Sequence, residues 1–323
     1  MTPLPENSQN AADALDKSVK MPAVSALVCT RNRGDSLTPT VRTILACAGI
    51  DELVIVDQST NEDTAKALAP FLADTRLHYI PSKTAGLGRA HNLGLAACRA
   101  DVVLITDDDC EVPPDWGEKF SAVFAENPRV AMAFCNTRPA PGDWPGGYIP
   151  TYERTGDLLL TRLRDRCKEN PIGAGMAVRK SVIQELGGFD ELMGPGAPIT
   201  SHEEDDMALR CLLRGRYVFE TDRTFVYHFG FRAIDESKAL TFRNYHGTGG
   251  GMAKLLKCRQ WPILRIAAYI VWATILLPLL GSLARLQKPR VVSRITGFYK
   301  GFALALKMPT DAEKLIFRGT GER

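Results

Sequence analysis

The segment 102–111, VVLITDDDCE, runs from four apolar residues and a threonine into three consecutive aspartates. The apolar residues favour a buried strand, which is expected to end by presenting carboxylates at the edge of a sheet. Side chains alternate along an extended chain, so Asp107 and Asp109 share one side and Asp108 faces the other. Carboxylates this close repel one another unless a cation offsets their charge. The segment therefore predicts that Asp107 and Asp109 share a divalent cation; the alternative is a solvated acidic turn.

Apolar strands and helices alternate along the amino-terminal part of the chain. Apolar runs predict strands at 23–29, 53–56, 77–80 and 102–105. Helical spacing of apolar residues predicts helices at 37–47, 63–72 and 88–98. Apolar strands separated by helices indicate a parallel sheet covered on both faces. Ligands of such sheets gather at the carboxyl ends of the strands, where Thr30, Asp57 and Asp107 lie.

The alternation continues beyond the aspartates with less regular spacing. We expect helices at 114–126 and 180–186, and extended segments at 130–134, 173–178, 217–219 and 224–227. The segment 138–150, RPAPGDWPGGYIP, is too rich in proline and glycine for regular structure. Structureless loops of this length tend to be functional, so we interpret it as a segment that covers the substrate, with a linker as the alternative.

A second acidic cluster occupies 201–206, SHEEDD, directly before the helical pattern MALRCLLRG. Acidic residues in the first turn of a helix interact favourably with its dipole, which is one explanation of the cluster. Four successive acids exceed what a helix end needs, however, and one of them is a candidate general base. His228 follows a predicted strand and is either an ordinary buried side chain or, if it lies near the aspartates, a metal ligand.

Composition limits the classes of function. The formal net charge of +3 is too small to indicate nucleic acid binding. Eight cysteines occur singly, without metal-knuckle spacing, which favours reduced thiols in a cytosolic setting. Residues 1–20 are polar and lack the apolar core of a secretory signal, so we expect a loosely attached tail and a catalytic part that faces the cytoplasm.

The carboxy-terminal part changes character. Residues 266–284 form an uncharged, almost wholly apolar run long enough to span a bilayer, although Pro278 would kink it and 285–294 is basic. A second stretch, 291–306, is more amphipathic. We expect membrane attachment by one kinked span, a re-entrant helix or an in-plane amphipathic pair. The alternative is a packed helical subdomain or an oligomer face.

Seven motifs in this order resemble the family-2 glycosyltransferases with the GT-A fold. They are SALVCTRNR (25–33), LVIVDQSTNED (53–63), AGLGRAHNLGL (85–95), VVLITDDDCEVPPDW (102–116), GAGMAVRKSVIQELGGFDE (173–191), SHEEDDMALRCLLRG (201–215) and VYHFGFR (226–232). The resemblance implies an α/β, Rossmann-like GT-A domain over 22–232, preceded by a tail (1–21) and followed by a helical, membrane-associated region (233–323).

The resemblance also implies a reaction and a site. A sugar would pass, with inversion, from a nucleotide-diphosphate sugar to a hydroxyl of a glycan or lipid-linked acceptor in cell-surface polysaccharide synthesis, at the cytoplasmic face of the cell membrane. Family members bind the nucleotide sugar at positions that match Thr30, Arg33, Asp57, Arg89, Asn92 and, near the ribose, Asp108. They bind Mn²⁺ or Mg²⁺ at positions that match Asp107, Asp109 and, in some members, His228.

The catalytic base follows from the family pattern GEDxDLxxR. Alignment through Met207 and Arg210 places Glu203 and Glu204 over its Glu-Asp pair and Asp206 over the later aspartate. The base position falls on Glu204, with Glu203 as second choice and Asp206 next.

Two other classes of function are considered. A sugar-1-phosphate nucleotidyltransferase would carry a glycine-rich, basic phosphate loop after the first strand, but TRNRGDS (30–36) has one glycine. A non-catalytic scaffold that kept the fold is disfavoured by the intact acidic motifs, although Glu204 stands where the family usually has aspartate.

Overall fold

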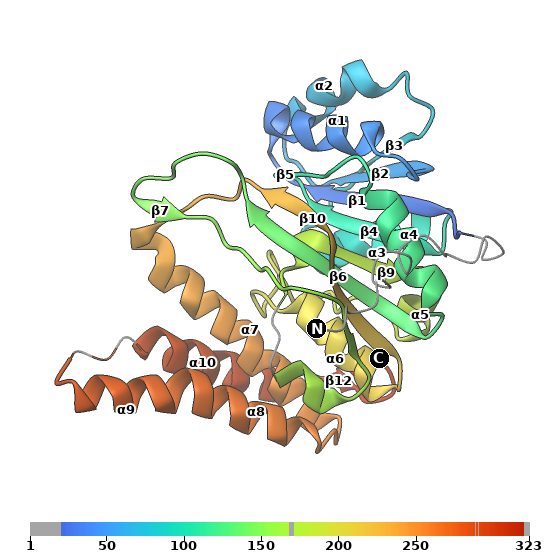
Figure 1. Cartoon of the computed structure of the whole chain (residues 1–323). Coiled ribbons are helices and arrows are strands. Elements are labelled where there is room, and N and C mark those ends of the chain that lie inside the picture. Colours follow the sequence, from blue (N-terminus) through green and yellow to red (C-terminus); the bar gives the residue numbers. More distant parts are fainter. Residues whose placement is uncertain (1–20, 168–170, 288, 290, 320–323) are drawn as a thin grey trace, which may run out of the picture.

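A mixed, mostly parallel sheet of nine strands forms the centre of the computed structural model, which describes residues 21–167, 171–287, 289 and 291–319 (Figure 1). Its first four strands are parallel and lie in the order β3–β2–β1–β4. Their bounds are β1 (Val24–Thr30), β2 (Glu52–Asp57), β3 (Leu77–Pro81) and β4 (Val102–Asp107). Thr30 pairs with Asp57 and Cys29 with Asp107, so these strand ends meet at one edge of the sheet, as predicted.

The second half of the sheet contains its antiparallel members. The strands are β5 (Cys110–Glu111), β6 (Val130–Pro139), β8 (Leu158–Leu160), β9 (Met176–Arg179) and β10 (Tyr217–His228). β9 lies antiparallel between β4 and β6, and β10 runs parallel to β6. β5 pairs with the end of β10, which places His228 opposite Cys110. A strand much later in the chain than β4 thus brings a histidine to the aspartates at the end of β4.

Three local predictions were wrong. The two short strands expected at 217–219 and 224–227 are one strand, β10, with an irregular register between Thr221 and Phe225. The polar residues that suggested a break are held by distant partners, since Arg223 forms ion pairs with Glu126 and Asp157. The segment 173–178 begins with a 3₁₀ turn, η4 (Gly173–Gly175), before it becomes extended. The loop 138–150 contains a short strand, β7 (Gly147–Tyr148), which pairs with β11 (Arg232–Ala233).

Helices cover both faces of the sheet, as expected. On one face lie α1 (Thr38–Ala46), α2 (Asp63–Leu68) and α4 (Trp116–Glu126). The 3₁₀ turn η1 (Gly34–Leu37) directly precedes α1, and η2 (Ala69–Phe71) directly follows α2. On the other lie α3 (Leu87–Ala97), α5 (Lys180–Glu185) and α6 (Glu203–Leu213), near η3 (Leu163–Cys167). Two separate buried clusters result: Val41 and Trp116 belong to the first, and Leu95 and Met207 to the second.

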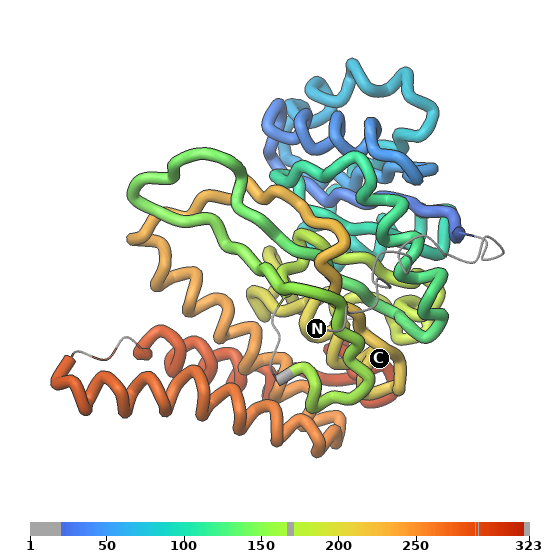
Figure 2. The backbone as a smooth tube through the Cα atoms, in the orientation of Figure 1, coloured from blue at the N-terminus to red at the C-terminus, as the bar shows by residue number. Residues whose placement is uncertain are grey.

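The carboxy-terminal helices form a layer at the end of the molecule opposite α1 and α2 (Figure 2). After η5 (Ile234–Glu236), they are α7 (Ser237–Lys257), α8 (Ile263–Val271), the π-helical turn η6 (Trp272–Leu276), α9 (Leu277–Ala284) and α10 (Val292–Lys307). A small hairpin, β12 (Thr310–Asp311) and β13 (Ile316–Phe317), follows.

The predicted irregularity at Pro278 takes the form of this π-helical turn. A proline has no N–H to donate to the carbonyl four residues earlier, here that of Thr274. Arg294 of α10 donates to that carbonyl oxygen from Nη1 at 2.6 Å. The proline therefore creates an acceptor that fastens α10 to the helix running from α8 to α9.

Backbone-to-backbone contact joins α7 to α10. A Cβ atom added to Gly249 would lie 2.1 Å from the carbonyl oxygen of Phe298, and one added to Gly301 would lie 1.9 Å from that of His246. The glycines allow the two helix axes to approach more closely than side chains permit. On its other side α7 contacts the segment before α6, where a Cβ on Gly247 would meet Ser201 at 2.2 Å.

We expect Gly301→Ala to lower the free energy of unfolding by about 1–3 kcal/mol, because the added methyl group must push α7 and α10 apart. Urea unfolding would measure the change. The matched control is Gly281→Ala in α9, where an added Cβ meets nothing within 4 Å; it should leave stability unchanged or raise it by up to about 1 kcal/mol. Equal effects of the two substitutions would contradict the tight packing of α7 on α10.

Candidate active site

A cavity of about 620 Å³ opens at the carboxyl edge of the sheet, between the first strands and α6. Eight of the predicted site residues line it: Thr30, Arg33, Asp107, Asp108, Asp109, Glu203, Glu204 and His228. The other four, Asp57, Arg89, Asn92 and Asp206, are not among its lining residues. The structure thus brings the two acidic clusters and His228 to one cavity.

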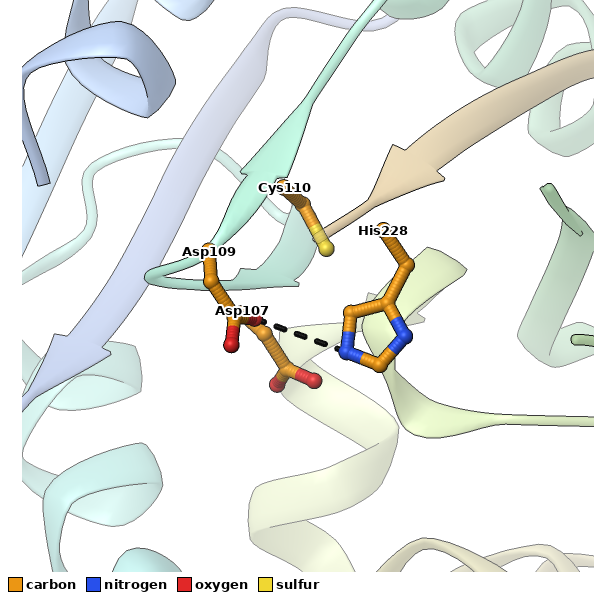
Figure 3. A group of neighbouring side chains, drawn as sticks. All are labelled: Asp107, Asp109, Cys110 and His228. Carbon is orange, nitrogen blue, oxygen red and sulfur yellow. Dashed lines mark ion pairs between the residues drawn. The ribbon is translucent and has the colours of Figure 1, made fainter. Parts of the chain in front are cut away.

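The first cluster presents candidate metal ligands. One ligand atom from each of Asp107, Asp109, Cys110 and His228 lies within 4.8 Å of all the others (Figure 3). His228 Nε2 lies 3.5 Å from Asp109 Oδ1. Its Nδ1 lies 3.2 Å from the carbonyl oxygen of Pro150, which can only accept, so the hydrogen resides on Nδ1. This anchor leaves Nε2 turned toward the carboxylates, the usual arrangement of a metal-binding histidine.

Electrostatics at this cluster favour a cation. Burial and the neighbouring carboxylate of Asp109 raise the pKa of Asp107 to about 6. Burial also raises the pKa of Asp109, but His228, Arg33 and Arg232 outweigh it and lower that pKa below its usual value. The thiol of Cys110 is fully buried, and burial raises its pKa well above the usual value. Two carboxylates and one imidazole therefore form the donor set, and this set suits Mn²⁺ or Mg²⁺.

Asp108 lines the same cavity but is not part of the group of candidate metal ligands. It accepts a hydrogen bond from Thr30 Oγ1 at 2.8 Å and pairs with Arg33 Nε at 2.9 Å. Arg33 also reaches Asp109, with Nη2 3.0 Å from Oδ2. Thr30, Arg33 and Asp108 therefore form one connected group beside the candidate metal ligands.

Two predicted nucleotide contacts, Asp57 and Arg89, have structural partners outside the cavity. Asp57 accepts hydrogen bonds from Tyr79 Oη and from the amide of Ser59, both at 2.8 Å. Arg89 forms an ion pair with Glu191. These bonds stabilise the strand end and the loop before α6, and the nucleotide-binding roles of both residues stay predictions.

Asn92 clamps the backbone of Phe189: its Nδ2 donates to the carbonyl at 2.9 Å and its Oδ1 accepts from the amide at 2.8 Å. Its nucleotide-binding role likewise stays a prediction. The side chain of this helix that lines the cavity is His91, whose ring packs 4.7 Å from that of Phe189. Burial lowers the pKa of His91 to about 4, so the ring is neutral at physiological pH.

The second cluster divides into two pairs along the first turn of α6. Glu203 and Glu204 line the cavity, whereas Asp205 pairs with His202 at 3.1 Å and with Arg166. Asp206 is fully buried away from the cavity, between Arg210 at 3.0 Å and Lys254 at 2.7 Å. Its role as a third candidate base stays a prediction, and its ion pairs with two buried cations do not favour it.

The pKa values of the cavity-facing pair are high. Burial, with the nearby charge of Asp107, raises the pKa of Glu203 to about 7. Burial and the charges of Glu203 and Asp205 raise the pKa of Glu204 well above its usual value. Two carboxyl groups this close retain a proton between them at neutral pH. Such a pair can accept a proton from a substrate hydroxyl more readily than an ordinary surface carboxylate.

Sequence reasoning did not assign several cavity-lining residues. Four of them are His91, His202, Arg232 and Arg243. His91 lies within the quoted motif AGLGRAHNLGL and Arg232 ends the motif VYHFGFR, so both had a local signal. His202 adopts φ +80°, a left-handed conformation that histidine tolerates better than most residues. Arg243 had no signal, because it lies on α7, in the region assigned to the membrane.

Known proteins share this architecture. Over 237 residues the chain is 26% identical to the glucosyl-dolichyl phosphate glucuronosyltransferase of Haloferax volcanii, covering 69% of this chain and 74% of the relative. It is 28% identical to an uncharacterized protein of Mycobacterium tuberculosis over 226 residues, 65% of this chain and 68% of the relative.

Among solved structures, a mannosyltransferase of Pyrobaculum calidifontis in complex with GDP-Man and Mn²⁺ superposes with a TM-score of 0.56 at 17% identity, over 89% of this chain and 87% of that one. This likeness confirms the expected GT-A-like fold. The family model of glycosyl transferase family 2 matches residues 25–187, half of the chain. The protein therefore belongs to glycosyl transferase family 2 and is a glycosyltransferase.

Proposed function

We propose that the enzyme transfers a sugar, with inversion, from a nucleotide-diphosphate sugar to a hydroxyl group of a glycan or lipid-linked acceptor in cell-surface polysaccharide synthesis. One observation carries the proposal: a single cavity holds a group of candidate metal ligands and a pair of carboxyl groups with raised pKa values. These are the two functions that a single displacement requires, a clamp for the diphosphate and a base for the attacking hydroxyl.

Asp107, Asp109 and His228 would hold Mn²⁺ or Mg²⁺, with the imidazole fixed by the carbonyl of Pro150. A bound cation offsets the negative charge that develops on the departing nucleoside diphosphate. Arg33 forms ion pairs with two of the aspartates, and both Arg33 and Arg232 line the cavity. Their two guanidinium groups would therefore lie near the phosphates of a bound nucleotide. Thr30, Arg33 and Asp108 line the adjoining part of the cavity, where we place the nucleoside.

Glu204 is the proposed base, and Glu203 the second candidate. Glu204 would take the proton of the acceptor hydroxyl while the oxygen attacks the anomeric carbon from the face opposite the nucleotide. The bond from that carbon to the diphosphate oxygen then breaks, and one displacement gives inversion. The first turn of α6 supports the ionised form of the pair through the helix dipole. Because the charge of Asp107 contributes to the raised pKa of Glu203, offsetting that charge favours ionisation of the pair.

We place the enzyme at the cytoplasmic face of the cell membrane. Among the described residues, one helix, Ile263–Ala284, has the length and the mean hydropathy, 2.1, of a membrane segment. The cysteines described as free, seven in number, agree with a reducing compartment. A relative whose name specifies a dolichyl phosphate-linked substrate supports a lipid-linked acceptor.

Donor and metal can be tested by thermal shift with nucleoside diphosphates and nucleotide sugars, in the presence of Mn²⁺, Mg²⁺ or EDTA. A ligand that binds only the folded state raises the melting temperature. We expect a shift for one nucleotide family that EDTA abolishes and that Asp109→Ala loses, because the substitution removes a cation ligand. Asp63→Ala, which changes an exposed aspartate of α2, is the control and should behave as wild type. Equal shifts with EDTA and with Mn²⁺ would contradict metal dependence.

Glu204→Gln should leave the donor-induced thermal shift nearly intact and lower kcat by about 10²–10⁴-fold, since the amide cannot accept the hydroxyl proton. Steady-state transfer assays would measure the loss. Glu191→Gln, at a carboxylate that is half exposed beside Arg89, is the control. Full activity of Glu204→Gln would rule out this base and direct attention to Glu203, whereas absent donor binding in the wild type would favour the scaffold alternative.

The carboxyl pair also predicts a pH dependence of stability in the absence of metal. The folded protein keeps a proton on Glu203 up to about pH 7, whereas the unfolded chain loses it near pH 4.5. The free energy of unfolding should therefore fall as pH rises from about 4.5 to 7. In Glu204→Gln this fall should be smaller by on the order of 1 kcal/mol, because the carboxyl group of Glu204, whose own pKa is raised by burial and by the charge of Glu203, no longer titrates. Identical profiles for the two proteins, from urea unfolding in EDTA, would contradict the coupling.

A further inference from the structure

We propose that α8, η6, α9 and α10 dock in the plane of an anionic lipid surface, and that the apolar helix Ile263–Ala284 lies in the membrane interface instead of crossing the bilayer. This inference rests on the proposed membrane location and is independent of the proposed chemistry. Three kinds of observation support it: the distribution of charge, the exposed side chains and the buried contacts of these helices.

The charge of the chain is divided unevenly. Residues 237–319 contain 14 lysines and arginines but only 2 acidic residues, whereas the rest of the chain contains 26 and 35. A region this basic is attracted to anionic surfaces. Arg259 and Arg265 lie at the beginning of the apolar helix and Arg285 at its end. The catalytic part of the chain carries the opposite net charge, so a negative surface favours one orientation of the molecule.

Two helices present exposed apolar side chains at helical spacing. Along and just before the apolar helix, most of them recur at steps of three to five residues, with Leu277 beside Leu276: Trp261, Leu264, Tyr269, Trp272, Leu276, Leu277, Leu280 and Leu283. On α10 the corresponding residues are Val292, Ile295, Tyr299 and Leu306. Trp272 is 53% exposed and Tyr299 71% exposed. Tryptophan and tyrosine beside basic residues are typical of the interfacial zone of a membrane.

The opposite face of the same helix belongs to the folded core. Ile263 and Ile266 are buried in a cluster with Leu209 of α6 and Leu255 of α7. At the π-helical turn, Arg294 donates to the carbonyl of Thr274. A helix that crossed the bilayer would have to leave these contacts and carry Arg265 with it. Because α8 and η6 are packed on one side through Ile263, Ile266 and Ile275, whereas α9 has no buried residue, the helix can enter the membrane interface without unfolding, and crossing the bilayer would break the packed contacts.

A second copy of the chain is the other occupant that could cover this face. Pairing two such surfaces would bring two strongly basic regions together, which is unfavourable. An anionic lipid surface offers the opposite charge and accepts aromatic and aliphatic side chains at the same time. Charge complementarity therefore favours lipid over a dimer.

The test uses the purified full chain and vesicles of phosphatidylcholine, with and without phosphatidylglycerol. We expect cosedimentation only with the anionic vesicles, and release by high salt. Trp272→Ser/Leu280→Ser should weaken partitioning about tenfold or more, since two large apolar side chains no longer enter the interface. The control is Leu72→Ser, a similarly exposed leucine at the opposite end of the molecule. Arg285→Glu should also weaken binding, while Lys66→Glu on α2 should not.

Three outcomes would overturn the proposal. The first is equal binding to neutral and anionic vesicles. The second is bound protein that resists both high salt and alkaline carbonate, which indicates a span. The third is the absence of vesicle binding together with a dimer, in light scattering, that Trp272→Ser/Leu280→Ser dissociates. The donor-induced thermal shift of that variant should equal that of the wild type, which shows that it is folded and separates failure of docking from failure of the proposed chemistry.

Discussion

Repulsion among carboxylates governs the catalytic end of this molecule. Asp107 to Asp109 and the pair Glu203 and Glu204 line one cavity, and burial makes each charge more costly than it would be in water. Arg33 and His228 each offset part of the negative charge of the three aspartates, yet the pKa of Asp107 still rises to about 6. A divalent cation would relieve this repulsion. The repulsion among these carboxylates is therefore itself an argument for a bound cation.

The four acids of α6 show how the fold separates structural charge from available charge. Asp205 and Asp206 each contact two cationic or ionisable partners: His202 and Arg166 for the first, and Arg210 and Lys254 for the second. Among the described residues, no cation forms an ion pair with Glu203 or Glu204, and these are the two that face the cavity. The same helical turn thus supplies anchors on one side and candidate bases on the other.

Local signals predicted the strand that runs into three aspartates, the alternation of strands and helices, and the pairing of Asp107 with Asp109 in one group of candidate metal ligands. The features that could not be predicted depend on contacts between residues that are far apart in the sequence. Asp206 matched a family position, but the lysine that neutralises it lies on α7, 48 residues later in the chain. His228 reaches the aspartates only because β5 pairs with the end of β10. Asn92 faces the backbone of Phe189, which spacing within α3 cannot reveal.

The helix α7 connects the cavity to the carboxy-terminal helices. Arg243 and Asn244 line the cavity, Gly247, Gly250 and Gly251 face the segment before α6, and Lys254 forms an ion pair with Asp206. The opposite side of α7 packs on α10, whose outer face carries exposed apolar residues. A helix fixed by backbone contacts on both sides moves with its neighbours. Of the carboxy-terminal helices, α7 is therefore part of the wall of the cavity, and its packing on α10 couples the outer helices to the segment that carries the acids of α6.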